Sequence, residues 1–179
     1  MSSRDTLIRS LHDVGLAAWF GGTLMGAVGL NGGAATATSP SERLKISSAG
    51  WMKWAPVQWA FMLAHAFGGL ALIYTNKERL KVQGEARTNT LVKAGLELLA
   101  GVVTIYSGFL GAKIAKNANE GGEGVTEPSA SASTELSSAQ KQQKVLQWAI
   151  PALTAILLVL GAQQGEQQRP FAGLLQSKK

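Results

Sequence analysis

The sequence predicts an all-α, polytopic membrane protein in which four transmembrane helices form a bundle. Four stretches of 17 to 19 residues are almost free of charged side chains, close to the roughly 20 apolar residues that cross a bilayer core. None of them has the polar face that a helix of a soluble bundle needs. Lysine and arginine residues flank these stretches, as is typical of residues placed at lipid headgroups.

The four spans are predicted in order along the chain. The first, over 14–30, is free of charge and rich in glycine, and the second covers 57–74 without an acidic residue, lysine or arginine. The third, over 94–112, carries Glu97 near one end, and the fourth covers 145–162. Each can extend into polar residues at its ends, so together they cross a bilayer four times.

Composition limits the kind of site that the chain can hold. The 179 residues are enough for one membrane domain over 1–179. The absence of cysteine excludes disulfides, iron–sulfur clusters and thiolate catalysis, and two histidines cannot make a three-histidine metal site. The net charge of +6 is explained by membrane lipid as the partner, so no nucleic acid is expected.

The distribution of basic residues predicts the orientation. Ten lysines and arginines lie in the two termini and the connection 75–93, and seven lie in the other two connections. Positive residues favour the cytoplasmic side. We therefore expect a multi-pass protein of the cell (plasma) membrane with both termini in the cytoplasm.

The two outer connections differ in composition. In the first, Ser39 and Pro40 are suited to start a helix, and a short helix lying in the membrane interface is expected to precede the second span. The second connection, about 119–138, is rich in Gly, Ser, Ala and Glu and is predicted to be flexible. Four tryptophans near this side are expected to act as interfacial anchors: Trp51, Trp54, Trp59 and Trp148.

Small residues recur at four-residue spacing, which lets helix backbones approach closely in a membrane. Such residues pack either within the chain's own bundle or against another membrane protein. The row of small residues on the first span is expected to be the most accessible to a neighbouring helix. The residues predicted to make these helix or partner contacts are Ala18, Gly22, Gly26, Ala60, Ala64, Gly68 and Gly108.

Few ionisable residues lie within the spans. His65 lies at the centre of the second span, where it is either a functional residue or the partner in one interhelical hydrogen bond. His12 and Asp13 are interpreted as an interfacial pair, and Glu97 is expected to pair with Lys93 while the lysine reaches outward. These residues make no complete catalytic site, and no metal or other cofactor is predicted.

One short motif suggests an alternative function. His12, six further residues and then Trp19-Phe20-Gly21-Gly22 resemble the first helix of the CopD-like copper-resistance proteins and of the HemJ-type protoporphyrinogen oxidases. The resemblance implies haem or copper handling with His12 as a ligand, and with His65 as the second candidate. A haem held by both histidines is not expected, because their positions in the two spans imply depths about 10–15 Å apart.

A longer resemblance supports the leading hypothesis. The segments 11–22, 50–58, 144–153 and 165–170 resemble a family of small actinobacterial membrane proteins. The resemblance suggests a non-enzymatic accessory or assembly subunit of a larger complex, the actinobacterial cytochrome bcc–cytochrome oxidase supercomplex of the respiratory chain. The expected partners are then cytochrome bcc and cytochrome oxidase subunits, in the service of electron transport. A small transporter is a third possibility, supported only by Pro56 and Pro151 as helix breaks.

Overall fold

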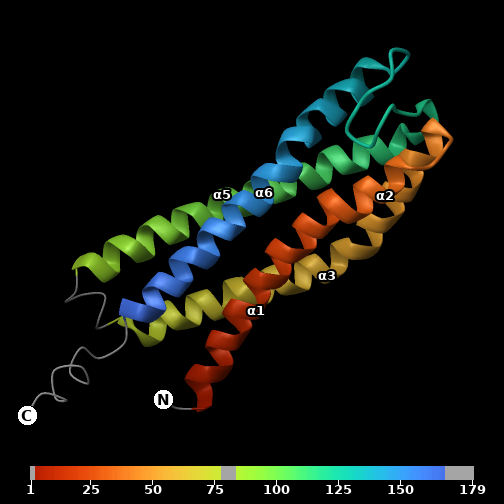
Figure 1. Cartoon of the computed structure of the whole chain (residues 1–179). Helices are drawn as coiled ribbons and strands as arrows, with labels where there is room; N and C mark the ends of the chain where they lie inside the picture. Colours follow the sequence, from red (N-terminus) through yellow and green to blue (C-terminus); the bar gives the residue numbers. More distant parts are fainter. Residues whose placement is uncertain (1–2, 78–83, 168–179) are drawn as a thin grey trace, which may run out of the picture.

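The computed structural model describes residues 3–77 and 84–167, and four long helices dominate it (Figure 1). The prediction of an all-α bundle is confirmed, since four helices are long and apolar enough to cross a membrane. The helical elements are α1 (Ser3–Met25) with its continuations η1 (Gly26–Leu30) and α2 (Asn31–Ala35), then α3 (Pro40–Thr75), α5 (Gly84–Lys116) and α6 (Thr134–Gln167).

The bundle is open along one side. Helix α1 packs between α3 and α6, and α5 packs mainly against α6. Helices α3 and α5 contact each other much less. The connection after α5 lies at one end of the bundle, and the described starts of α1 and α5 lie at the other (Figure 1).

Helix α3 runs through the segment where two separate helices were expected. It begins at Pro40, with Ser39 at the N-cap as predicted, and continues for 36 residues through Pro56 to Thr75. At about 1.5 Å per residue it is about 54 Å long, well beyond the roughly 30 Å of a bilayer core. The prediction of a separate interfacial helix before residue 57 is therefore wrong, because the amphipathic segment joins the span as one rod.

One turn of π-helix interrupts the first span. Residues Gly26–Leu30 form this wider turn, and the chain then returns to α-helix at Asn31. A π turn accommodates one extra residue, so every later residue is rotated about the helix axis. Before the π turn, the buried face of α1 includes His12, Leu16, Trp19 and Thr23. If this spacing continued in a regular α-helix, residue 30 would face inward, but Asn31 is buried in its place.

The connection between α5 and α6 is folded, and the prediction of flexibility over 119–138 is wrong. The short helix η2 (Ala118–Glu120) follows α5, and Gly121 turns the chain with a φ of 75°, a conformation that favours glycine. The connection closes over the ends of three long helices (Figure 1). Together they bury a small apolar cluster: Leu44, Leu110, Ile114, Ala118, Leu136 and Ala139.

Two polar side chains hold this connection in place. The guanidinium of Arg43 donates to the carbonyl oxygens of Ala37, Gly122 and Glu123. The buried amide of Gln140 donates to the carbonyl oxygens of Gly124, Val125 and Glu127 at 3.1–3.4 Å. The carbonyl groups of a glycine-rich segment thereby gain partners that its composition alone does not reveal.

Candidate functional site: a buried histidine pair

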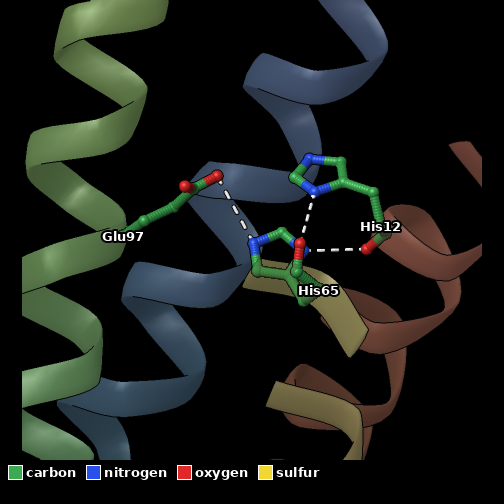
Figure 2. A group of neighbouring side chains, drawn as sticks. All are labelled: His12, His65 and Glu97. Carbon is green, nitrogen blue, oxygen red and sulfur yellow. Dashed lines mark hydrogen bonds and ion pairs between the residues drawn. The ribbon is translucent and has the colours of Figure 1, made fainter. Parts of the chain in front are cut away.

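His12 and His65 lie side by side inside the bundle, on α1 and α3 (Figure 2). Their residues are 5% and 3% exposed. The expected difference in depth is wrong. The first helix long enough to cross the membrane begins near Thr6 and not at residue 14, so His12 lies within the span and not before it. The second begins near Pro40 and not at residue 57, so His65 lies in the last third of its helix and not at its centre.

Glycines permit this close approach of α1 and α3. A methyl group on Gly15 would lie 2.5 Å from the carbonyl oxygen of Phe61. A methyl group on Gly68 would lie 2.7 Å from the backbone nitrogen of His12. Neither distance is tolerated by a real Cβ, so the backbones can meet at the histidines only because these positions carry no side chain.

The two histidines exchange hydrogen bonds with each other's main chain. Nδ1 of His12 lies 3.0 Å from the carbonyl oxygen of His65, and Nδ1 of His65 lies 2.8 Å from the carbonyl oxygen of His12. A carbonyl oxygen can only accept, so each Nδ1 carries a hydrogen and donates it. The rings stack with centroids 4.1 Å apart, and in a neutral ring the lone pair is left on Nε2.

Lys93 and Glu97 of α5 complete the cluster. They form the predicted pair, with 3.8 Å between Lys93 Nζ and Glu97 Oε1. Lys93 does not reach outward, however. It is buried, and Nζ lies 2.8 Å from His12 Nε2, to which it donates. The interpretation of His12 and Asp13 as an interfacial pair is also wrong, since Asp13 is exposed while His12 points into the bundle.

The contact between His65 and Glu97 requires a hydrogen or a metal ion between the two groups. His65 Nε2 lies 3.3 Å from Glu97 Oε1 (Figure 2), and it is buried without a hydrogen-bond partner. A lone pair on Nε2 and an ionised carboxylate would repel each other, because both are acceptors. Either a proton or a metal ion must therefore lie between them.

Trp19 is a further member of this site, which the sequence analysis named only as part of the motif that follows His12. Its ring meets His65 edge-on at 6.3 Å, and its Nε1 donates to Thr104 at 3.2 Å. The spacing of seven residues from His12 could have indicated it, since such residues share a helix face. The motif did not indicate, however, that Trp19 would contact His65 on another helix.

The predicted packing residues differ in what surrounds them. Gly22 and Gly26 pack inside the chain's own bundle, because a methyl group there would overlap Trp54 and Trp51. The first span therefore presents no open stripe to a partner at these glycines. Gly68 faces His12, whereas Gly108 lies open, with no atom within 4 Å of the point where a Cβ would be attached. The three alanines complete the set: Ala18 and Ala64 are half-buried, and Ala60 is exposed.

The four tryptophans likewise divide into two pairs. Trp59 and Trp148 are about half exposed, at 46% and 51%, as anchors at a membrane interface would be. Trp51 and Trp54 are only partly exposed and pack on glycines of the first span, so these two rings also join helices within the chain, and their role as anchors stays a prediction. The indole of Trp51 donates to Asn31 Oδ1 at 2.9 Å.

Asn31 centres a polar network away from the histidines. Its Oδ1 also accepts from Ser47 Oγ at 2.8 Å, and its Nδ2 donates to Gln147 Oε1 at 3.0 Å. A cavity of about 270 Å³ lies beside this network, between α3 and α5. None of His12, His65, Lys93 and Glu97 lines it.

A haem held by both histidines does not fit this arrangement. Bis-histidine ligation places the porphyrin between two Nε2 atoms, whereas here the faces of the two rings are in contact at 4.1 Å. His12 Nε2 is also engaged by Lys93. No protein-family profile, curated protein or solved structure matches this chain.

Proposed function

We propose that this multi-pass membrane protein is a non-enzymatic accessory subunit that packs against a larger membrane protein through its α3–α5 side. One observation carries the proposal, the cavity between α3 and α5. These two helices contact each other much less than α1 contacts α3 or α5 contacts α6. A bundle closed on all sides would pair these two helices. Here their facing surfaces are available to a helix of another protein.

The chemistry of this side suits a protein partner. Gly108 and Gly111 on α5 have open space where a side chain would begin, and Trp59 on α3 lines the same cavity. Small residues let a neighbouring helix approach, and dispersion contacts with aromatic rings then stabilise the contact. Ser107 and Gln143 also line the cavity, where they bond to each other across α5 and α6.

The specific partner follows from the longer sequence resemblance. We propose cytochrome bcc and cytochrome oxidase subunits of an actinobacterial respiratory supercomplex as the larger assembly. A subunit of this kind needs a rigid apolar surface and no reacting groups, so removing it should leave the electron-transfer chemistry of the assembly in place.

The experiment compares two glycines of α5. Gly108→Leu fills the α3–α5 side, whereas Gly95→Leu adds the same side chain at an equally open position that does not line the cavity. Both variants should insert and keep the wild-type melting temperature, because neither leucine has an atom of the chain beside the start of its side chain. From native membranes, wild type and Gly95→Leu should co-purify with the partner, and Gly108→Leu should not.

Two results would contradict the proposal. If both leucine variants retain the partner equally, the α3–α5 side is not the contact. If the wild-type protein never migrates together with cytochrome-containing complexes on a native gel, the respiratory assignment is wrong, even if the protein co-migrates with another partner.

A further inference from the structure

We infer that the cavity between α3 and α5 binds a neutral, membrane-soluble ring compound that carries a carbonyl oxygen. The cavity has a volume of about 270 Å³, near the lower end of small-molecule sites, so it takes the ring head of such a molecule and not a long tail. The ligand site goes beyond the accessory role. It is tested on the purified protein without any partner, so the result for the ligand and the result for the partner do not decide each other.

The lining of the cavity is uncharged. None of the described residues that line it is an aspartate, glutamate, lysine, arginine or histidine. An ionised ligand would lose its hydration there without gaining a group of opposite charge, which is costly. The cavity therefore selects against phosphate-bearing headgroups and favours a neutral molecule.

The cavity reaches the outer surface of the bundle. Met52 and Trp59 both line it, and these residues are 69% and 46% exposed. They belong to α3, one of the helices long and apolar enough to cross a membrane, so their exposed surface faces lipid. A ligand dissolved in the bilayer can therefore enter from the side and leave an apolar tail among the lipid chains.

The aromatic lining is formed before a ligand binds. Three indole rings line the cavity, those of Trp51, Trp54 and Trp59. Trp51 Nε1 donates to Asn31 Oδ1 and Trp54 Nε1 donates to Gln58 Oε1, each at 2.9 Å. Both of these rings also lie against glycines of the first span. Aromatic side chains pack well against another flat ring, and side chains already held in place lose little further freedom on binding.

The hydrogen-bonding groups left available on α3 are donors. Gln58 Oε1 already accepts from Trp54, so the amide nitrogen Nε2 is the group that remains for a ligand. Neither Gln58 Nε2 nor the neighbouring Trp59 Nε1 has a hydrogen-bond partner among the described residues. An amide or indole N–H can only donate, and leaving it unpaired in an apolar medium is costly. A carbonyl oxygen on the ligand supplies the missing acceptor.

The test compares two ligands that differ in their carbonyl groups. The probe is a naphthoquinone with a short alkyl tail, and the matched compound is the alkylnaphthalene without carbonyl oxygens. The full-length protein in detergent is titrated with the quinone, which quenches tryptophan fluorescence, and wild type should bind one equivalent saturably. The alkylnaphthalene should displace the quinone only at concentrations at least about tenfold higher, because it leaves the donors of the cavity without an acceptor.

Two leucine variants test whether the cavity is the site. Gly108→Leu places a side chain in the cavity and should abolish saturable quenching, which leaves only the effect of quinone dissolved in the micelle. Gly95→Leu adds the same side chain at an open position that does not line the cavity. It should bind the quinone as wild type does.

Two further variants remove the donors one at a time. Gln58→Met keeps the length of the side chain without its amide, and Trp59→Phe keeps an aromatic ring without the indole N–H. Each should weaken quinone binding at least about fivefold and leave binding of the alkylnaphthalene nearly unchanged. A purely structural effect would weaken both ligands alike. Trp59→Phe decides the matter if Gln58→Met does not fold, because the Trp59 residue is 46% exposed.

Three outcomes overturn the inference. If wild type binds the quinone no better than Gly108→Leu does, the cavity takes no such ligand. If the alkylnaphthalene competes as well as the quinone, or both donor variants keep the preference for the quinone, the carbonyl oxygen is not recognised. If diacylglycerol displaces the quinone and binds more tightly, the cavity holds a lipid ester and not a ring.

Discussion

His12 and His65 hold each other's backbone: Nδ1 of each donates to the carbonyl oxygen of the other, at 3.0 and 2.8 Å. Both carbonyl groups belong to long helices, α1 and α3. The reciprocal pair therefore joins α1 to α3 at one level and fixes both rings in one stacked orientation. Removing either ring loosens the position of the other.

The contact of α1 with α3 at this level should be sensitive to a single methyl group. Gly68→Ala places Cβ 2.7 Å from the backbone nitrogen of His12 and 2.8 Å from the carbonyl oxygen of Ile8. We expect a loss of about 1–3 kcal/mol, typical of overpacking, or about 2–4 °C in melting temperature for each kcal/mol. Gly101→Ala, where nothing lies within 4 Å of the added carbon, should not lower the melting temperature. Equal effects would show that the helices can move apart freely.

Asn31 should be needed for stability. Asn31→Leu leaves Ser47 Oγ, Trp51 Nε1 and Gln147 Oε1 without their present partner. Each buried group left unpaired costs about 1–3 kcal/mol, so thermal unfolding in detergent should begin at a clearly lower temperature. Gln142→Leu removes an exposed amide that donates to Ser138 and accepts from Tyr106, and it serves as the control for losing polar contacts at an exposed position. An unchanged melting temperature for Asn31→Leu would mean that water replaces the lost bonds.

The connection between α5 and α6 should resist proteolysis. Arg43 holds the carbonyl groups of Gly122 and Glu123, so a glutamyl endopeptidase should cut wild type slowly after Glu123, although that side chain is exposed. Arg43→Ala should be cut several times faster, because cleavage needs a locally open backbone. Lys45→Ala removes an exposed positive charge from the same helix and should behave as wild type. Rapid cleavage of wild type would restore the prediction of a flexible connection.

The orientation can be measured by cysteine labelling, since the chain has no cysteine of its own. The connection that carries Ser131 and the end of α3 beside Lys77 lie at opposite ends of the bundle (Figure 1). In intact cells Ser131→Cys should react with a membrane-impermeant thiol reagent, and Lys77→Cys should react only after the membrane is permeabilised. The reverse pattern would place both termini outside.

The four spans could be predicted because hydropathy depends on local composition alone. Their ends could not, because the helices continue into polar segments such as 40–54, where packing rather than apolar content maintains the helix. The fold of the connection 117–133 depends on Arg43 and Gln140, which lie outside that segment, so its composition suggested flexibility. Individual functional candidates were visible, since His12, His65, Lys93 and Glu97 all stood out as ionisable groups.

Their assembly into one cluster was not predictable from the sequence. The cluster depends on which residue of α1 lies beside which residue of α3. The predicted ends of the two spans were displaced along the helices, and each residue of error moves a side chain by about 1.5 Å along the bundle axis. The histidines were therefore expected to lie far apart. The same holds for Gly22 and Gly26, whose spacing indicated a close contact but could not identify Trp54 and Trp51 as the groups that cover them.

The π turn at Gly26–Leu30 gives the first span two separate phases. Before it, the inward face carries His12 and Trp19, and after it the same face carries Asn31 instead of Leu30. Deleting one residue within 26–30 would restore a uniform α-helix and leave Asn31 at the inward position beside Ser47 and Trp51, whereas closing the π turn without a deletion would rotate Asn31 by about 100°. The histidine end would keep its alignment. The one extra residue of the π turn thus places Asn31, and not Leu30, on the same inward face as His12 and Trp19.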